Sequence, residues 1–314
     1  MDRIDPLNER TILHGGVSCE VAIERDGDGC EIVVKQALPR LRVRADWRAD
    51  PARAGVEANG LRAIRELLGA DVAPEVVWED PGRCRFAMRR VDPRLRNWRD
   101  DLNKRRIDLT TAARAGQLLG LLHTRSSPRA DLAQRFAQRD FFEQLRIEPF
   151  FVRIAQRNPD LAPLIDQAVA ALRAPGRVLV HGDYSPKNML VDGAEVVILD
   201  CEPAHWGNPR FDVGFCMMHL ILDGIHRPPA SDYLPAAVSF IDAYAAHGPR
   251  DALDAELVRI AGCLLLARLE GDSPIDYLHE LDAPAVKDIA ATLIREPVSD
   301  PRRMLNRVLD PTGR

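Results

Sequence analysis

The sequence predicts an α+β protein with two lobes, in which a small antiparallel sheet lobe precedes a larger and mainly helical lobe. Strand patterns dominate the first part of the chain, helical periodicity dominates from about residue 108, and two short apolar strands flank a polar loop near residue 185. The segment Arg89 to Pro93 has the composition of a connector. We therefore expect a first lobe at residues 1–91 and a second lobe at residues 92–314.

The composition is typical of a soluble globular protein. The chain has 314 residues, of which 46% are hydrophobic and 29% are charged, and its formal net charge is -4. This charge gives no reason to expect a nucleic-acid partner, and no apolar run is long enough for a membrane span. The amino terminus is charged, and the six cysteines lack zinc-like spacing. We expect a cytoplasmic monomer or homodimer with reduced thiols.

The sheet lobe opens with a glycine-containing turn followed by two strands. The strands are predicted within residues 19–34 and are joined by a tight turn at residues 26–29. The preceding turn is His14 to Ser18. Glycines allow backbone N–H groups to approach phosphate oxygens closely, although two adjacent glycines are often no more than a turn. The candidate nucleotide contacts in this turn are Gly15, Gly16 and Ser18.

A lysine and a glutamate are predicted to form a buried ion pair in this lobe. Lys35 ends the second strand, and a helix is predicted from Pro51 to Leu68, with Asp50 as its N-cap. Glu57 shares the apolar face of this helix, whereas Glu66 lies on the opposite side. A carboxylate on an apolar face requires a partner, and Lys35 is the natural one. The alternative is that Glu57 lies at the edge of the apolar stripe and reaches water.

A second hairpin and a connector complete the lobe. The hairpin is predicted from Val76 to Met88, around a turn at Asp80 to Gly82. An adenine ring could form hydrogen bonds with the exposed backbone of the connector that follows. Met88 is a further candidate nucleotide contact.

Helices dominate the second lobe. His123 lies on the apolar face of a predicted helix that begins at Leu109, and we interpret it as a hydrogen-bonded core histidine and not as a catalytic group. The aromatic stretch from Phe141 to Phe151 is interpreted as core, with a substrate-binding wall as the alternative. Later helices are predicted at residues 211–222, 233–247, 251–269 and 285–294.

The centre of the sequence is a polar loop, His181 to Val191. Short apolar strands precede and follow it, and the second strand ends at Asp200. In a magnesium-dependent phosphoryl transfer, one carboxylate faces the attacking hydroxyl while other oxygen ligands hold the metal on the nucleotide phosphates. The alternative is that Asp183 and Asn188 form only local turn hydrogen bonds. The candidate residues are Asp183, Asn188, Asp200 and Glu202.

This loop resembles the catalytic loop of the aminoglycoside phosphotransferase family, relatives of the protein kinases that include choline kinases and methylthioribose kinases. The resemblance rests on His181-Gly182-Asp183, on Asn188 and on Asp200 at the end of a strand. It implies a bilobal protein-kinase-like fold, with Asp183 as catalytic base and His181 as structural support. It also implies that ATP and Mg2+ are used, with Asn188 and Asp200 as metal ligands and Glu202 as a possible further one.

The resemblance implies a phosphotransferase that moves the γ-phosphate of ATP to a hydroxyl group of a small molecule. The acceptor could be an aminoglycoside, a sugar such as methylthioribose, or an amino alcohol. The segment from Lys35 to Arg42 is similar to methylthioribose kinases, whereas Asn188 is more typical of aminoglycoside and choline kinases. Lys187 departs from the family pattern, which has a small residue there, and its ammonium could reach a phosphate or point to solvent.

Other residues of the second lobe receive roles from the same resemblance. Asp212 is expected to brace the catalytic loop through backbone N–H groups. His205 and Trp206 are candidates for lining the acceptor pocket from an exposed loop. Arg268 and Glu270 could face the acceptor, yet a charged pair at a helix end is usually solvated.

Two other functional classes are alternatives to a small-molecule kinase. A nucleotide-binding pseudokinase would be expected to lack one of the residues that contact the nucleotide, the metal or the hydroxyl, and none is missing. A metal hydrolase could use the ligands His181, Asp183, Asp200 and His205, and would bind its metal without ATP.

Overall fold

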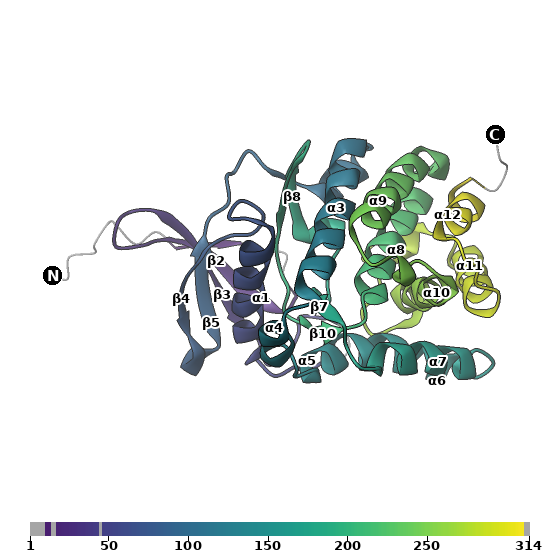
Figure 1. The fold of residues 1–314 in the computed structure, drawn as a ribbon, viewed down its shortest axis with the longest axis horizontal. Coiled ribbons are helices and arrows are strands. Elements are labelled where there is room, and N and C mark those ends of the chain that lie inside the picture. The colour runs from purple at the N-terminus through teal and green to yellow at the C-terminus, as the bar shows by residue number, and fades with distance from the viewer. Residues whose placement is uncertain (1–9, 14–16, 44–45, 311–314) are drawn as a thin grey trace.

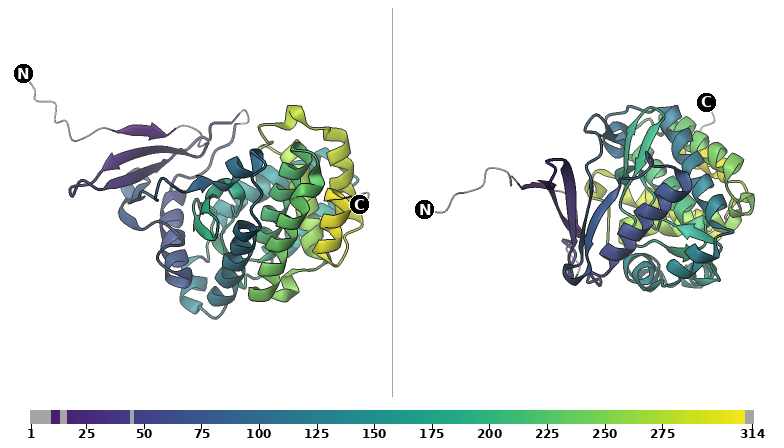
Figure 2. Two further views of the ribbon diagram at one scale, coloured as in Figure 1. Left: turned by 90° about the horizontal axis from the view of Figure 1, so that it is seen from above. Right: turned by 60° about the vertical axis from the view of Figure 1, so that its left-hand side comes forward.

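The first lobe is an antiparallel sheet with one helix packed beside it. The computed structural model describes residues 10–13, 17–43 and 46–310. The sheet has the strand order β1-β2-β3-β5-β4, and it lies at one end of the molecule with the helices of the second lobe at the other (Figures 1 and 2). The strands are β1 (Thr11–Leu13), β2 (Cys19–Arg25), β3 (Glu31–Ala37), β4 (Val76–Asp80) and β5 (Arg85–Arg89).

Both predicted hairpins are confirmed. The turn between β2 and β3 closes where the Asp26 N–H donates to the Cys30 carbonyl, and Gly29 takes a left-handed conformation with φ 78°. A short 3-10 turn, Pro81–Arg83, joins β4 to β5. The boundary between lobes at residues 91 and 92 stays a prediction.

Helix α1 (Arg53–Leu68) begins two residues later than predicted. The Asp50 carboxylate accepts a hydrogen bond from the Ala52 N–H at 2.9 Å, so it stabilises the turn before the helix and is not the N-cap. The apolar face of α1 is buried as expected, and Glu57 is buried on it. The helical phase therefore identified the inward-facing carboxylate correctly.

The second lobe surrounds two small β-elements with helices. Strands β7 (Val178–Val180) and β10 (His205–Gly207) pair with each other, while β8 (Met189–Asp192) pairs with both β6 (Arg96–Asn97) and β9 (Glu195–Ile198). The helical elements are α2 (Trp98–Asn103), α3 (Leu109–Ser126), α4 (Ala130–Arg135), α5 (Asp140–Phe142), the π-helical segment η2 (Glu143–Val152), α6 (Arg153–Arg157), α7 (Ala162–Arg173), α8 (Arg210–His226), α9 (Leu234–His247), α10 (Ala255–Glu270), α11 (Ala283–Arg295) and α12 (Pro301–Leu309).

A single cluster of buried apolar side chains extends through both lobes. The predicted aromatic core stretch is confirmed, since Phe142, Phe150 and Phe151 are buried in this cluster. No helix in the part of the chain that the structure describes has the length and hydropathy of a membrane span.

Helices α3 and α9 run side by side in close contact (Figure 1). Gly116 of α3 faces α9, and a Cβ atom at this position would lie 2.0 Å from the carbonyl oxygen of Phe240. A side chain at residue 116 therefore could not fit without moving one helix. The lack of a side chain at Gly116 is what allows α9 to approach α3.

Gly116→Ala tests this close approach. Because α3 and α9 must separate, we expect the free energy of unfolding to fall by about 1 to 3 kcal/mol. Gly55→Ala in α1 is the matched control, because a Cβ there meets nothing within 4 Å and alanine is favoured over glycine in a helix by about 1 kcal/mol. Urea unfolding measures both variants, and equal stabilities would contradict this account of the packing.

Candidate active site

The polar loop begins where buried strand β7 ends, and a carboxylate from α8 holds it. Asp212 accepts hydrogen bonds from the backbone N–H groups of His181 at 2.7 Å and Gly182 at 2.8 Å. Gly182 has φ 79°, and a Cβ atom there would lie 2.7 Å from the carbonyl oxygen of Pro203, so glycine is required at this turn. The predicted brace by Asp212 is confirmed.

Asp212 is itself part of a buried polar network. His123 Nε2 lies 3.3 Å from the Asp212 carboxylate, and His123 Nδ1 lies 2.9 Å from the Tyr244 hydroxyl. Burial alone would raise the pKa of Asp212, but the hydrogen bond and charge of His123 lower the pKa below its usual value. The interpretation of His123 as a hydrogen-bonded core histidine is confirmed.

His181 supports the loop through both ring nitrogens. Its Nδ1 accepts the Asp183 N–H at 3.1 Å, and its Nε2 lies 3.1 Å from the carbonyl oxygen of Leu199. Burial lowers the pKa of His181. A neutral imidazole with its proton on Nε2 satisfies both contacts, so this residue connects the loop to the segment between β9, which ends at Ile198, and Asp200.

Asp183 is buried, and its carboxylate is held by three side chains. Asn188 Nδ2 donates to Asp183 Oδ2 at 2.7 Å, and Lys187 Nζ lies 3.1 Å from the same oxygen. Arg146 Nη2 lies 2.8 Å from Oδ1, although not in the direction of a hydrogen bond. Within the described residues Oδ1 therefore has no hydrogen-bond donor, and it is free to accept one from a bound hydroxyl group.

Sequence reasoning missed Arg146. The residue lies within the aromatic stretch of η2, which was interpreted as core, and its Nε donates to the Gly182 carbonyl at 2.8 Å. An arginine among the aromatic residues of this run was the available signal, because a buried guanidinium requires a partner. The periodicity of the run could not show that this partner would be Asp183.

Lys35 connects both lobes through two ion pairs. Its Nζ lies 2.6 Å from Glu57 Oε1 and 2.7 Å from Asp200 Oδ1. Burial opposes the charge of the ammonium, but the two carboxylates outweigh this and raise the pKa of Lys35. The predicted pair with Glu57 is confirmed, and the contact with Asp200 extends it.

Asp200 has a left-handed backbone, with φ 65°. Such a conformation costs about 1 to 3 kcal/mol for most side chains, less for Asp, and it is common at functional sites. Burial would raise the pKa of Asp200, but the positive charges of Lys35 and Lys187 lower it to about 2. The residue is therefore an ionised carboxylate fixed beside the loop.

Asn188 and Asp200 have oxygens available for a metal ion. Both hydrogen bonds of the Asn188 amide use its Nδ2, and the Asp200 contact with Lys35 uses Oδ1. Among the described residues neither Asn188 Oδ1 nor Asp200 Oδ2 has a hydrogen-bond or ion-pair partner, and the Asp200 side chain is 30% exposed. Two protein oxygens of this kind suit Mg2+, which is usually held by one or two side chains together with substrate phosphates.

Glu202 is engaged with the first lobe. Its Oε2 accepts from Arg53 Nε at 3.0 Å, while its Oε1 accepts from Ser18 Oγ at 3.0 Å and from Cys19 Sγ at 2.8 Å. These contacts are those of a buried ion pair. The metal role of Glu202 and the nucleotide contact of Ser18 therefore stay predictions.

The remaining predicted nucleotide contacts are Met88, Gly15 and Gly16. Met88 lies in β5 opposite Val33, and its side chain is buried. Gly15 and Gly16 lie outside the described residues. The nucleotide contacts of all three stay predictions.

The role predicted for His205 is wrong. The residue lies in strand β10, its ring stacks on Phe142 with the centroids 4.0 Å apart, and its Nδ1 contacts the Pro203 carbonyl. Burial lowers the pKa of His205 to about 4. It is a core residue and not part of an exposed loop, so the hydrolase hypothesis loses one of its ligands. Trp206 is only partly buried, and its backbone N–H donates to the Phe136 carbonyl.

Arg268 and Glu270 are both partly exposed but do not pair with each other, and a contact of either residue with the acceptor stays a prediction. Glu270 contacts Lys287 and Asn158, whereas the guanidinium of Arg268 donates to the Ser273 carbonyl at 2.6 Å. Burial lowers the pKa of Arg268 to about 10, and Asp183 acts on it in the opposite direction. Arg268 therefore lies near the loop and away from Glu270.

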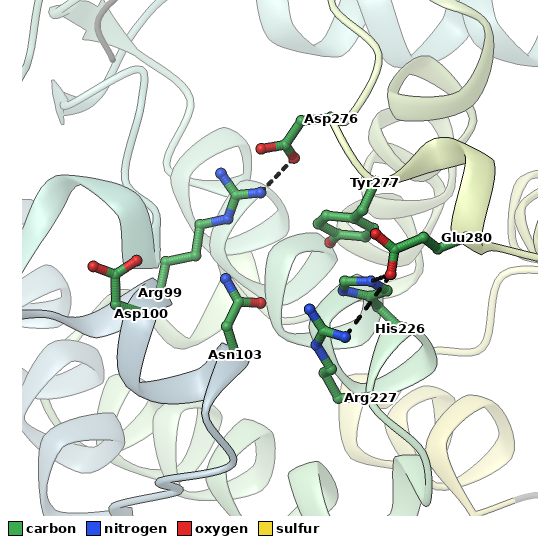
Figure 3. A pocket seen from close by; sticks show the side chains of 8 residues that line it. All are labelled: Arg99, Asp100, Asn103, His226, Arg227, Asp276, Tyr277 and Glu280. Atoms are coloured by element: carbon green, nitrogen blue, oxygen red, sulfur yellow. Dashed lines mark hydrogen bonds and ion pairs between the residues drawn. The ribbon is translucent and has the colours of Figure 1, made fainter. Parts of the chain in front are cut away.

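A polar pocket of about 320 Å³ lies between α2 and the chain after α10. In Figure 3, Arg99 reaches from α2 toward Asp276, and the ring of Tyr277 lies beside that of His226. The Asn97 side chain, just before α2, donates to the Lys187 carbonyl. Helix α2, which carries three of the residues that line the pocket, is thus attached at its start to the loop that carries Asp183.

Comparisons with known proteins agree with this geometry. The model of the phosphotransferase enzyme family matches residues 13–247. A methylthioribose kinase from Escherichia coli is 25% identical over 232 residues, which make up 65% of this chain and 55% of that protein. The chain therefore spans about half the length of this curated relative.

Solved structures share the fold. A choline/ethanolamine kinase family protein from Mesorhizobium loti has a TM-score of 0.55 and 19% identity, covering 98% of this chain and 93% of its own. An amicoumacin kinase in complex with AMP-PNP, Ca2+ and Ami has a TM-score of 0.59 and 14% identity, covering 98% and 90%. The predicted bilobal kinase-like α+β fold is confirmed by these likenesses.

Replacing Asp212 tests the network that holds the loop. Asp212→Ala leaves two buried N–H groups and His123 without their partner, so we expect the free energy of unfolding to fall by about 3 kcal/mol or more. Asp242→Ala removes an exposed carboxylate that pairs with Arg302, and we expect a change within about 0.5 kcal/mol. Chemical denaturation compares the two variants, and similar losses would argue against a bracing role.

The lowered pKa of Asp212 also predicts how stability depends on pH. A lowered carboxyl pKa contributes stability above the value in the unfolded chain, about 3.9, and this contribution is lost as pH falls through the folded value. The difference in melting temperature between the wild type and Asp212→Asn should therefore be largest at neutral pH and narrow below about pH 4. Scanning calorimetry measures it, and a difference that widens in acid would contradict the sign.

Proposed function

We propose that this chain, which belongs to the phosphotransferase enzyme family, transfers the γ-phosphate of ATP to a hydroxyl group of a small molecule. One observation carries the proposal. The same buried loop fixes Asp183, which has an oxygen free to accept from a hydroxyl, and is tied through His181 to the segment in which Asp200 is paired with Lys35. These contacts support a site in which Asp183 would act as the base and Lys35 would bind the phosphates.

The nucleotide would bind between the lobes at residues 1–91 and 92–314. The Lys35 ammonium, oriented by Glu57 at 2.6 Å, is placed to contact its phosphates. The turn that contains Gly15, Gly16 and Ser18 would cover the phosphates, and Met88 would lie near the adenine ring. We place the reaction in the cytoplasm, where ATP is available and the cysteines stay reduced.

Asn188 Oδ1 and the Asp200 carboxylate would hold Mg2+. When bound, Mg2+ neutralises charge on the transferring phosphoryl group. The contacts of Glu202 with Arg53, Ser18 and Cys19 support a different role for that residue. We propose that it anchors the metal-binding segment to α1.

Asp183 would orient the acceptor. The hydroxyl oxygen forms a bond with the γ-phosphorus, the bond from that phosphorus to the bridging oxygen breaks, ADP leaves, and the hydroxyl proton passes to Asp183. Because the transition state of phosphoryl transfer is loose, positioning and charge neutralisation supply most of the rate. The contacts of Asp183 with Asn188, Lys187 and Arg146 support this role, since they fix the direction of the carboxylate.

Two measurements test the proposal. The melting temperature should rise with ATP and Mg2+ together, and ADP release should depend on an acceptor from a panel of sugars, sugar acids, aminoglycosides, choline and methylthioribose. A rise with divalent metal alone, with no effect of nucleotide, would instead favour a metal hydrolase. Binding of nucleotide without turnover on any acceptor would favour a pseudokinase.

Substitutions assign the roles. Asp183→Asn should lower kcat by about 10² to 10⁴ while the shift in melting temperature with ATP and Mg2+ remains. Asp200→Ala should abolish turnover, because the metal loses its carboxylate. Asp192→Asn, at an exposed position in the β8 and β9 hairpin, is the control and should keep full activity. Full activity of Asp200→Ala would refute the mechanism.

A further inference from the structure

Positive charge gathers near Asp183 and His219. The charges of Arg268, Lys187, Arg99 and Arg146 all act on His219 of α8. Two of these cations pair with Asp183, and Arg99 pairs with Asp276. We call the group formed by Arg146, Lys187, His219, Arg268 and Arg99 the cationic cluster.

Arg268 has no carboxylate partner among the described residues. Its hydrogen bonds go to the carbonyl and hydroxyl oxygens of Ser273, and its Nε is buried without an acceptor. A buried guanidinium is costly unless its donors are satisfied. An anionic group of a ligand would supply the missing acceptor.

His219 provides a second and independent observation. Only 5% of the residue is exposed, and its Nε2 has no hydrogen-bond partner in the described part of the chain. Burial and the neighbouring cations lower the pKa of its imidazole well below the usual range. The ring is therefore neutral, and its Nε2 can donate or accept a hydrogen bond without adding a charge to the site.

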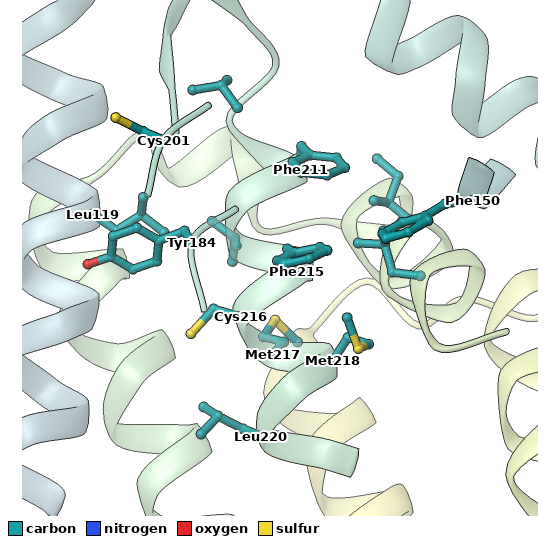
Figure 4. Packing of buried hydrophobic residues seen from close by; sticks show 14 of the residues in the cluster. Leu119, Phe150, Tyr184, Cys201, Phe211, Phe215, Cys216, Met217, Met218 and Leu220 are labelled. Atoms are coloured by element: carbon teal, nitrogen blue, oxygen red, sulfur yellow. The ribbon is translucent and has the colours of Figure 1, made fainter. Parts of the chain in front are cut away.

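An aromatic platform holds these groups in position. Phe150 of η2 and Phe215 of α8 face each other with centroids 6.2 Å apart (Figure 4). The Arg146 guanidinium lies 5.5 and 5.4 Å from these two rings, and that of Arg268 lies 6.0 Å from Phe150. The His219 ring packs edge-on against Phe215, at 5.1 Å. Stacked guanidinium groups are restricted in direction and present a fixed fork of donors.

Acidic residues do not cancel this charge. The carboxylates near the cationic cluster are Asp183, Asp276 and Asp223, against four formal cations. Asp200, which also attracts Lys187, is paired with Lys35. Burial raises the pKa of Asp223 to about 7, so this carboxyl is partly protonated near neutral pH. A net positive charge remains, and it would disfavour a cationic acceptor.

We propose that the acceptor is a small polyhydroxylated acid, whose carboxylate or phosphate group binds Arg268 and His219 while one of its hydroxyl groups faces Asp183. The polar pocket that Arg99 and Tyr277 line, about 320 Å³ in volume, would hold the other hydroxyl groups. This inference rests on the proposed function, and it narrows the acceptor class to anions. Aminoglycosides and choline, which are cations, become poor acceptors.

Matched probes test the proposal. Glycerate and glycerol phosphate are compared with glycerol, gluconate and glucose phosphate with glucose, and choline serves as the cation. Binding is measured by calorimetry with Mg2+ and ADP present at saturation, so that the nucleotide phosphate site is filled. The acidic members of at least one series should bind about tenfold or more tightly than the neutral parent. Carboxylate and phosphate probes distinguish the two sources of the anionic group.

Variants locate the binding. Arg268→Gln should lower the affinity for the preferred acidic probe by about tenfold or more and leave the affinity for ADP unchanged. Arg302→Gln, which removes the same charge from an exposed pair with Asp242, should change neither affinity. If Arg268→Gln does not fold, His219→Phe provides the same comparison.

The outcomes separate the two proposals. Equal binding of acidic and neutral probes, a preference for choline, or unchanged binding in both Arg268→Gln and His219→Phe overturns the anionic acceptor and leaves the phosphotransferase standing. Failure to bind ADP with Mg2+ at all overturns the proposed function, and this inference with it.

Discussion

The Lys35 ammonium, shared between Glu57 and Asp200, is the interaction on which the rest of the site depends. Lys35 lies in strand β3, and its two partners come from helix α1 and from the segment after β9, so one buried cation joins the two lobes. Breaking a buried ion pair by removing one partner costs about 3 to 5 kcal/mol, because the remaining charge is left uncompensated. The lobes are therefore joined where a nucleotide would place its phosphates.

A second buried pair strengthens this junction. Arg53, one turn before Glu57 on α1, contacts Glu202, two residues after Asp200. Between these pairs the helix and the segment approach closely, since a Cβ atom on Gly60 would lie 2.4 Å from Cys201 Sγ. Two ion pairs and one glycine thus fix the distance between α1 and Asp200. They also fix the distance from Lys35 to the loop that carries Asp183.

Sequence reasoning found the parts of this arrangement that follow from local periodicity. Glu57 was identified because its position on an apolar helix face demands a partner, whereas the role of Asp212 was expected from the resemblance to the aminoglycoside phosphotransferase family. Arg146 and Arg53 were missed because their partners are distant in the sequence. His205 was misassigned because a strand of three residues is too short to show an alternating pattern. The burial of Arg268 Nε could not be predicted, because it results from tertiary packing alone.

In the reaction that we propose, different elements of this fold carry the chemistry and the acceptor specificity. Asp183, Asn188 and Asp200 are fixed by one short stretch of chain and by the backbone contacts of Asp212. The cationic cluster is assembled from α2, η2, the loop, α8 and α10, which are distant in sequence and meet only through helix packing. A substitution on α10 can therefore change the charge offered to an acceptor without moving the groups that hold the phosphates. This separation would let the same loop act on sugars, amino alcohols or acids, with the surrounding helices deciding which of them binds.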